Sequence, residues 1–308
     1  MLAAPVTKKY LCAHGITARP PRERIPGSHA ESCIPIRRCR IYSCRDTCLF
    51  LARDSGNIQS TDNHCYGARI ACYNEGAFPY RATGDTYADA WIGYFGTGYA
   101  IKTTITNVLF QHNTTRDCVF TNYGCSLEGC NVEVMRDVEA YNQIPIPFTP
   151  LVPTYTDKKV GVELAGDNCS IRGGLVELKD WIHPAPGLHT PTGDAAEAIW
   201  VTGNACLIET QLFDHDGVNG SIGIRAKAAV QGLTVDCTTR GFHQLNDRVI
   251  VFHPTLDPKG IDITLRISGM TTKSIDDYVD IAVGWTGKFR VINAATGEIT
   301  DLVEGSAH

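Results

Sequence analysis

The sequence lacks a long hydrophobic run, an excess of basic residues and any of the closely paired cysteines that mark strong metal motifs. Without a run of about 18 apolar residues, no segment is expected to enter a membrane. The formal net charge of −5 argues against nucleic acid as a partner, because phosphate binding needs a basic surface. Hydrophobic residues make up 43% of the chain and charged residues 20%, which indicates a folded protein.

The first residues also lack the pattern of a secretory signal. The mildly apolar residues 2–6 come before Lys8 and Lys9, the reverse of the order in a signal peptide. We therefore expect the chain to fold in a cytosol. A disulfide scaffold is not expected in so long a chain without such a signal.

The chain has 13 cysteines, for which two interpretations compete. A zinc site is conceivable where five metal-ligating residues come close in sequence: Cys39, Cys44, Cys48, His64 and Cys65. Because no CxxC pair occurs, we favour the alternative that most cysteines are small buried hydrophobic residues. We predict no metal and no cofactor.

A motif recurs in four segments, 102–112, 124–134, 168–178 and 205–215. Its first apolar column holds Ile105, Leu127, Ile171 and Ile208, and its second holds Phe110, Val132, Val176 and Phe213. A small-residue column contains Cys125, Cys169 and Cys206, and the preceding turns share Asn122, Gly166 and Gly203, residue types that favour a left-handed backbone. Fainter copies lie at 37–44, 67–74, 228–237 and 261–269.

The repeat predicts an all-β fold, a right-handed single-stranded parallel β-helix. The spacing of the columns fits coils of about 22–25 residues, and such a period is typical of a solenoid. Short apolar strands between Gly and Asn turns, without helical periodicity, favour strands over helices. A β-sandwich is the main rival, but it does not explain columns in register.

The prediction divides the chain into three parts. Residues 1–32 form a basic, proline-rich N-terminal arm, and residues 33–274 form the β-helix. Proline-rich insertions at 141–160 and 181–197 project from it as loops, because proline cannot continue a strand ladder. Residues 275–308 form a small β-rich cap that begins with a hairpin.

The coil pattern at 102–134, 161–178, 198–215 and 222–237 resembles that of the pectate-lyase-like right-handed β-helix proteins. This group includes polysaccharide lyases and hydrolases and the tailspikes of bacteriophages. The resemblance to the tailspike branch implies a homotrimer, an N-terminal segment that joins other virion proteins, and contact with host-surface polysaccharide. It also implies assembly in the host cytoplasm and a final location in the virion. The acidic motifs of polygalacturonase-like hydrolases are absent, so the resemblance carries over no catalytic residues.

Candidate catalytic residues come from the repeat itself. It aligns Glu133, Glu177 and Asp214 in one outward column, and carboxylates one or two coils apart have the separation that glycoside hydrolysis uses. His215 and Asp216 extend this group. The alternative is a solvated surface with ion pairs, as the neighbouring column Glu128, Arg172 and Glu209 suggests.

Candidate ligand-binding residues lie in the two insertions. One insertion carries Trp181, His183 and His189, and the other carries Tyr141, Phe148 and Tyr155. Aromatic rings stack on sugar faces, but such loops can equally pack against a neighbouring subunit.

Three functional hypotheses remain open. The first is a phage virion component, a tailspike or tail-fibre-like protein that contacts carbohydrate on the host surface. The second is an enzyme that cleaves polysaccharide as a glycoside hydrolase or lyase. The third is a structural capsid decoration protein without a receptor role.

Overall fold

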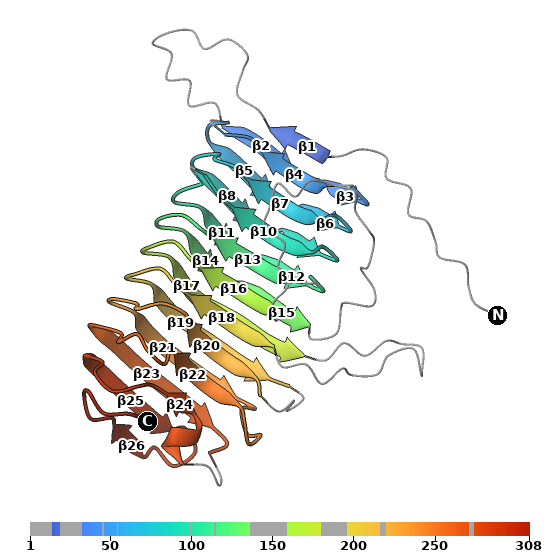
Figure 1. The fold of residues 1–308 in the computed structure, drawn as a ribbon. Helices are drawn as coiled ribbons and strands as arrows, with labels where there is room; N and C mark the ends of the chain where they lie inside the picture. The colour runs from blue at the N-terminus through green and yellow to red at the C-terminus, as the bar shows by residue number, and fades with distance from the viewer. Residues whose placement is uncertain are drawn as a thin grey trace, which may run out of the picture.

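The chain winds through two long parallel β-sheets that form a solenoid, as the computed structural model shows (Figure 1). The structure describes residues 14–18, 33–44, 46–53, 55–98, 100–113, 115–135, 159–179, 196–215, 220–270 and 274–308. The predicted parallel β-helix is therefore confirmed. Within these residues, no helix has the length and apolar character needed to cross a membrane.

Sheet A receives one strand from each coil. Its ten strands, in spatial order, are β1 (His14–Ala18), β4 (Thr47–Leu51), β7 (Ile70–Asn74), β10 (Ile92–Gly96), β13 (Arg116–Phe120), β16 (Val160–Leu164), β18 (Glu197–Val201), β20 (Ile222–Ala226), β22 (Arg248–Phe252) and β24 (Val279–Asp280). The order follows the chain, as expected when each coil stacks on the one before it.

Sheet B is bent in the early coils, where each coil gives it two short strands. The first strands are β2 (Ile34–Arg37), β5 (Ile58–Thr61), β8 (Tyr80–Thr83), β11 (Thr104–Thr106) and β14 (Ser126–Glu128). The second strands are β3 (Arg40–Tyr42), β6 (His64–Tyr66), β9 (Thr86–Ala88), β12 (Leu109–Gln111) and β15 (Asn131–Met135).

The later coils give sheet B one long strand each. These are β17 (Ser170–Lys179), β19 (Leu207–Asp214), β21 (Thr234–Arg240), β23 (Ile261–Ser268) and β25 (Gly287–Asn293). β26 (Ile299–Asp301) pairs antiparallel with β25 and ends the sheet, and a short 3-10 turn, η1 (Ile275–Asp277), precedes β24.

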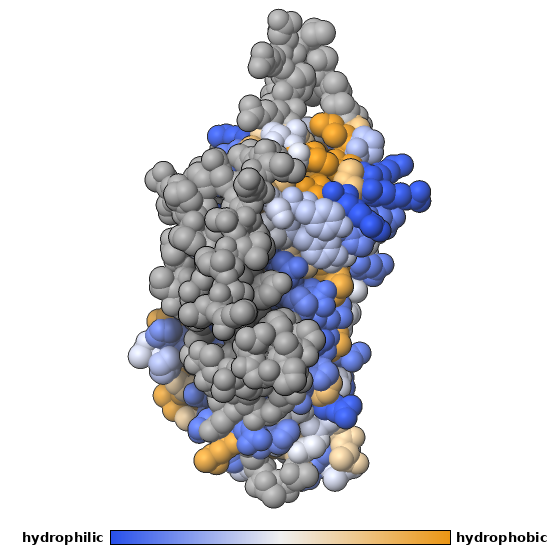
Figure 2. All heavy atoms as spheres, turned by 90° about the vertical axis from the view of Figure 1, so that its right-hand side faces the viewer, coloured by the Kyte–Doolittle hydropathy of each residue, from blue (hydrophilic) through white to orange (hydrophobic). Residues whose placement is uncertain are grey.

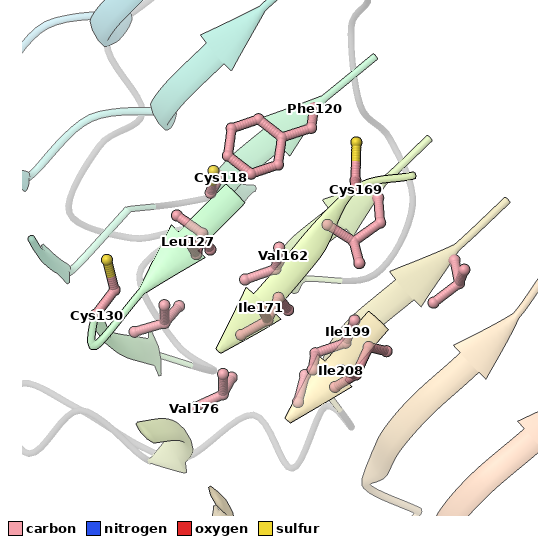
Figure 3. Packing of buried hydrophobic residues seen from close by; sticks show 14 of the residues in the cluster. Cys118, Phe120, Leu127, Cys130, Val162, Cys169, Ile171, Val176, Ile199 and Ile208 are labelled. Carbon is pink, nitrogen blue, oxygen red and sulfur yellow. The ribbon is translucent and has the colours of Figure 1, made fainter. Parts of the chain in front are cut away.

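The structure confirms the first apolar column. Ile105 pairs in register with Leu127, Leu127 with Ile171, and Ile171 with Ile208, and all four side chains are buried. Figure 3 shows the last three in one core with Val162 and Ile199 of sheet A. This column is therefore a ladder of stacked apolar side chains in the interior.

The column of cysteines is also an interior column. Cys125, Cys169 and Cys206 are buried, and their thiols donate to the carbonyl oxygens of Ala100, Asn122 and Gly166 at 3.3, 3.1 and 3.5 Å. In the part of the chain that the structure describes, no three His, Cys, Asp or Glu side chains form a group able to hold a metal ion.

The turn residues Asn122, Gly166 and Gly203 do stack on one another, as predicted. The predicted reason, a left-handed backbone at these three positions, was wrong. The left-handed backbone occurs two residues later, at Gly124, Asn168 and Ala205. Gly166 and Gly203 are small because adjacent turns approach closely: a Cβ on Gly203 would lie 2.1 Å from the carbonyl oxygen of Gly166.

The second apolar column differs from the prediction at its last member. Phe110, Val132 and Val176 are in register, but the next residue in the column is Leu212. The cause is a register shift between Arg172 and Leu175, where Gly173 and Gly174 of β17 face only Thr210 of β19. Because β19 is one residue shorter here, every side chain of β19 after Thr210 lies on the opposite face from the one predicted.

The two ends of the chain also depart from the expected layout. β1 lies within the range assigned to the arm, yet it pairs parallel with β4. In the range assigned to the cap, β25 pairs parallel with β23, so the coil continues there. β25 also pairs antiparallel with β26, so a hairpin lies within the predicted cap range, one strand later than expected.

Candidate functional site

One row of outward side chains crosses five successive coils of sheet B, from β12 to β21. Gln111, Glu133, Glu177, Phe213 and Arg240 follow one another in register on β12, β15, β17, β19 and β21. They alternate along each strand with buried core residues, as expected for a strand with one face on the core. We call these five residues the outer row.

The centre of the outer row is a cluster of charged groups. The Lys179 ammonium lies 3.3 Å from Oε1 of Glu133 and 3.2 Å from Oε1 of Glu177. Nε2 of His215 lies 2.5 Å from the other carboxylate oxygen of Glu177. The Glu177 carboxylate thus lies between a lysine and a histidine, and Glu177 is only 6% exposed.

Aromatic and cationic groups continue the row toward the C-terminus. The rings of Phe213 and His215 have centroids 3.8 Å apart, and the guanidinium of Arg240 lies 5.1 Å from the Phe213 ring centroid. Such stacking restricts the motion of these side chains. The row thus presents hydrogen-bonding and apolar surfaces in fixed positions.

The structure brings together two of the three predicted catalytic residues. Glu133 and Glu177 are neighbours on adjacent coils. The placement of Asp214 beside them was wrong: Asp214 is in register with Leu178, is 1% exposed and belongs to the inward face of β19. The one-residue difference between β17 and β19 is the reason.

The predicted loop ligands cannot be placed. Trp181, His183, His189, Tyr141, Phe148 and Tyr155 all lie outside the described residues, as does Asp216. The predicted column Glu128, Arg172 and Glu209 is in register.

Sequence reasoning missed Lys179, the outward position of Phe213 and the contribution of Arg240. Lys179 is two residues after Glu177 and so shares its face, a signal that the sequence did contain. The positions of Phe213 and Arg240 depend on the shortened coil, which the repeat alignment did not detect.

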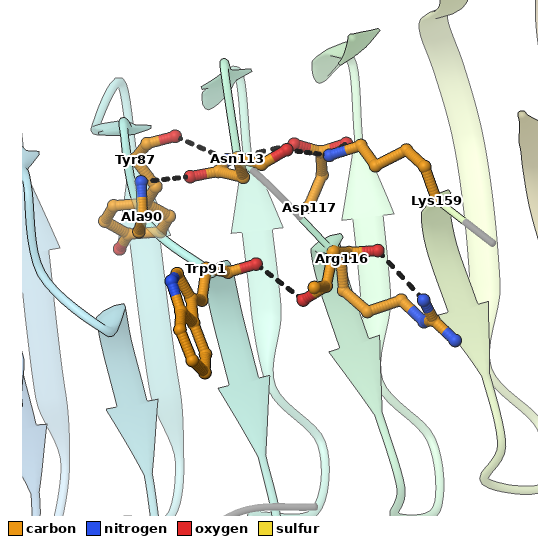
Figure 4. Close-up of polar contacts among 8 residues, drawn as sticks. Tyr87, Ala90, Trp91, Asn113, Arg116, Asp117 and Lys159 are labelled. Atoms are coloured by element: carbon orange, nitrogen blue, oxygen red, sulfur yellow. Dashed lines mark hydrogen bonds and ion pairs between the residues drawn. The ribbon is translucent and has the colours of Figure 1, made fainter. Parts of the chain in front are cut away.

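A second polar cluster lies beside sheet A (Figure 4). The Asn113 amide donates to Oδ1 of Asp117 at 2.9 Å, and Nζ of Lys159 lies 3.4 Å from Oδ2 of Asp117 and also donates to the Asn113 carbonyl. Burial raises the pKa of Asp117 to about 6 and lowers the pKa of Lys159. All three are buried, so the cluster holds β13 and β16 together and offers little to a ligand.

The fold and the outer row define a parallel β-solenoid with a built polar surface on one sheet. Comparison with protein-family models, with curated proteins and with solved structures found no match.

Proposed function

We propose that the protein is a bacteriophage virion component, a spike or fibre that contacts the host surface by binding a polysaccharide along the outer row. The carrying observation is that carboxylate, amide, aromatic and guanidinium groups follow one another on successive coils. Strands lie about 4.8 Å apart, so the row offers contacts at regular steps along an extended polymer. Carboxylates accept hydrogen bonds from sugar hydroxyls, and Phe213 supplies an apolar ring.

The assignment to a virion is supported by the resemblance of the coil pattern to phage tailspikes and by the elongated solenoid. A solenoid has a long lateral face for ligands, and its ends are free for other contacts. We propose a homotrimer that joins other virion proteins through its N-terminal residues. Light scattering of the full chain should then give three times the chain mass of 33.6 kDa; a monomer would contradict this part.

Binding to a panel of bacterial capsular polysaccharides tests the main proposal. For any polysaccharide that binds the full chain, Phe213→Ala should weaken affinity roughly tenfold, as expected for a central aromatic contact. Glu209→Gln is the matched control, because this exposed residue lies on the first half of the same strand. Equal loss in both variants, or loss in neither, would contradict binding along the outer row.

A second candidate function is polysaccharide cleavage at Glu133 and Glu177. Their position on adjacent coils with one shared lysine favours it, since retaining glycosidases place two carboxyl groups about 5 Å apart. Both carboxylates are already engaged within the protein, however, since each contacts Lys179 and Glu177 also contacts His215. We therefore rank binding first. Release of reducing ends that Glu177→Gln abolishes would reverse this order.

A further inference from the structure

The first coil leaves an open edge on sheet B. β2 and β3 are the two terminal strands of this sheet, and in the described residues they pair only with β5 and β6. Sheet A extends one strand further at the same end, because β1 pairs with β4 and is the terminal strand there. An open edge presents unpaired N–H and C=O groups and so accepts an added strand.

The two edge strands are not equally able to accept a partner. The amides of Ile34 and Arg38 bond to Asn57 and Thr61 of the next coil, so the open-side positions between them are Arg37 and Pro35, and Pro35 has no N–H. On β3, the amide of Ser43 bonds to Tyr66 of the next coil. Alternation along the strand then directs the amides of Arg40 and Tyr42 to the open side. β3 therefore offers two open-side amides where β2 offers one, which makes β3 the better edge for pairing.

The side chains around β3 are strongly basic. Arg37, Arg38 and Arg40 are all exposed, and none of them has an ion pair in the part of the chain that the structure describes. Ile41 is buried between Arg40 and Tyr42, so these two point outward together. Asp62 follows Thr61, the register partner of Arg37, and Asp89 lies near Tyr66, so these three arginines outnumber the two carboxylates on a chain whose net charge is −5.

An aromatic stack lies beside these arginines. Tyr42 is 53% exposed, and its ring stacks on Tyr66 with centroids 5.4 Å apart and an interplanar angle of 11°. His64 extends the stack, with Nδ1 3.2 Å from the Tyr66 hydroxyl. At this N-terminal end of the solenoid, hydrophobic and strongly hydrophilic residues lie side by side (Figure 2).

Arg and Tyr are the residue types enriched at protein interfaces, and Lys is depleted there. An edge that only needed protection from aggregation would be served by lysine or proline alone. We propose that β3 and the surrounding arginines form a docking site for an extended acidic segment of a partner protein, added to sheet B as a β-strand beside β3. The charge of the patch selects acidic side chains, and the open edge selects an extended backbone.

The proposal does not depend on the outer row, since Ala88 on β9 separates Tyr66 from Gln111 in the register of sheet B. Loss of carbohydrate binding by Phe213→Ala and loss of docking by a β3 variant are therefore separate results. Each can fail without the other.

The test uses the full chain and a fluorescent peptide of alternating Glu and Val as the probe. We expect a Kd on the order of 10 μM at low salt that weakens as salt rises. Arg40→Glu should weaken binding at least tenfold, whereas Lys288→Glu, an exposed site on the last coil, should change it less than twofold. Circular dichroism confirms that both variants fold.

Two further probes separate strand addition from charge attraction. The same peptide with alternate amides N-methylated should not bind, because it cannot donate to the edge, and hydrogen exchange should slow at residues 40–42 only with the unmodified peptide. Binding of the methylated or the Lys-Val peptide, no binding up to millimolar concentration, or displacement by polygalacturonate with the same Arg40 dependence would each overturn the proposal. The last outcome would assign the patch to an anionic glycan.

Discussion

The coils before Gly173 and the coils after it differ in the shape of sheet B. In the early coils a left-handed residue bends the sheet at one corner, and these residues stack in a column: Arg38, Asp62, Gly84, Asn107, Gly129 and Gly173. In β19, β21 and β23 the strand runs straight through this position. A single residue per coil therefore decides whether the sheet is bent or straight.

The first bent coils also differ in what their interior contains. Next to the corner, the amide of Cys39 bonds to Oδ1 of Asn63 at 2.9 Å, and the amide of Asn63 bonds to Oδ1 of Asp85 at 2.7 Å. These donors need side-chain acceptors, because buried N–H groups are almost always paired. The straight strands keep such donors in the ladder, and Val235 and Leu265 fill their interior. The first bent coils thus hold buried polar residues at this position, whereas the next two bent coils hold Val108 and Cys130 there.

The largest effect is expected where the bent region ends. In Gly174→Val, the new Cβ would lie 2.1 Å from the carbonyl oxygen of Cys130, in a residue with φ of +73°. We expect a loss of roughly 4 kcal/mol or more in the free energy of unfolding, from the clash and the strained backbone together. Urea denaturation measures it. Gly269→Ala is the control, since it is left-handed but open, and should lose only about 1 kcal/mol.

The buried polar network of the bent coils gives the next prediction. Asp85 accepts hydrogen bonds from the Asn63 amide, from Ser60 and from the Tyr87 hydroxyl, the last at 2.9 Å. Asp85→Ala leaves these donors unpaired and should lower the free energy of unfolding by about 3 kcal/mol or more. A loss no greater than that of Thr61→Ala, on the outward face of β5, would show that bent coils do not need the network.

A buried carboxylate in the bent region predicts an unusual pH dependence. Burial raises the pKa of Asp117 from 3.8 to about 6, so between these values the folded protein keeps a proton that the unfolded chain releases. Its contribution is therefore complete below pH 3.8 and is lost as pH rises through about 6. The loss is up to about 3 kcal/mol, since one pKa unit corresponds to about 1.4 kcal/mol.

Urea midpoints at pH 4 and pH 7 test this contribution. Relative to the double variant Asp117→Asn, Lys159→Met, the natural chain should lose stability between the two values. The double variant removes both members of the buried pair, so that neither is left alone. Parallel pH profiles for the two proteins would refute the assignment.

The smallest effect is expected on the straight coils. Arg266 and Asp236 form an ion pair across β23 and β21, and both side chains are more than 40% exposed. Exposed pairs of this kind contribute little, so Arg266→Ala should change the free energy of unfolding by less than about 1 kcal/mol. A larger loss, measured by urea denaturation, would mean that surface pairs rather than the apolar interior hold the straight coils.

The comparison explains which parts of the structure the sequence could predict. Ile105, Leu127, Ile171 and Ile208 were placed in register because each coil fills that column with a large aliphatic residue. The coils before residue 100 were hard to align because Ser60, Ala82 and Tyr87 occupy the same columns without a common apolar character. Ser60 and Tyr87 donate to the buried Asp85, and a search for apolar periodicity does not detect such polar residues.

The sequence predicted the part of the candidate site that precedes the register shift, but not the part that follows it. Glu133 and Glu177 precede the register shift, and the structure places them as adjacent residues. Asp214 follows the shift, so a constant repeat length put it on the wrong face. The contact of His215 with Glu177 depends on the same shift and could not be inferred from spacing alone.

Thiol labelling tests the central claim, that the shortened coil turns residue 213 outward and residue 214 inward. Phe213→Cys and Asp214→Cys are each treated with a maleimide under native conditions, and peptide mapping by mass spectrometry reads the modified position apart from the natural cysteines. We predict rapid labelling at position 213 and protection at position 214 until the protein is unfolded. Labelling at 214 with protection at 213 would contradict the register on which the outer row rests.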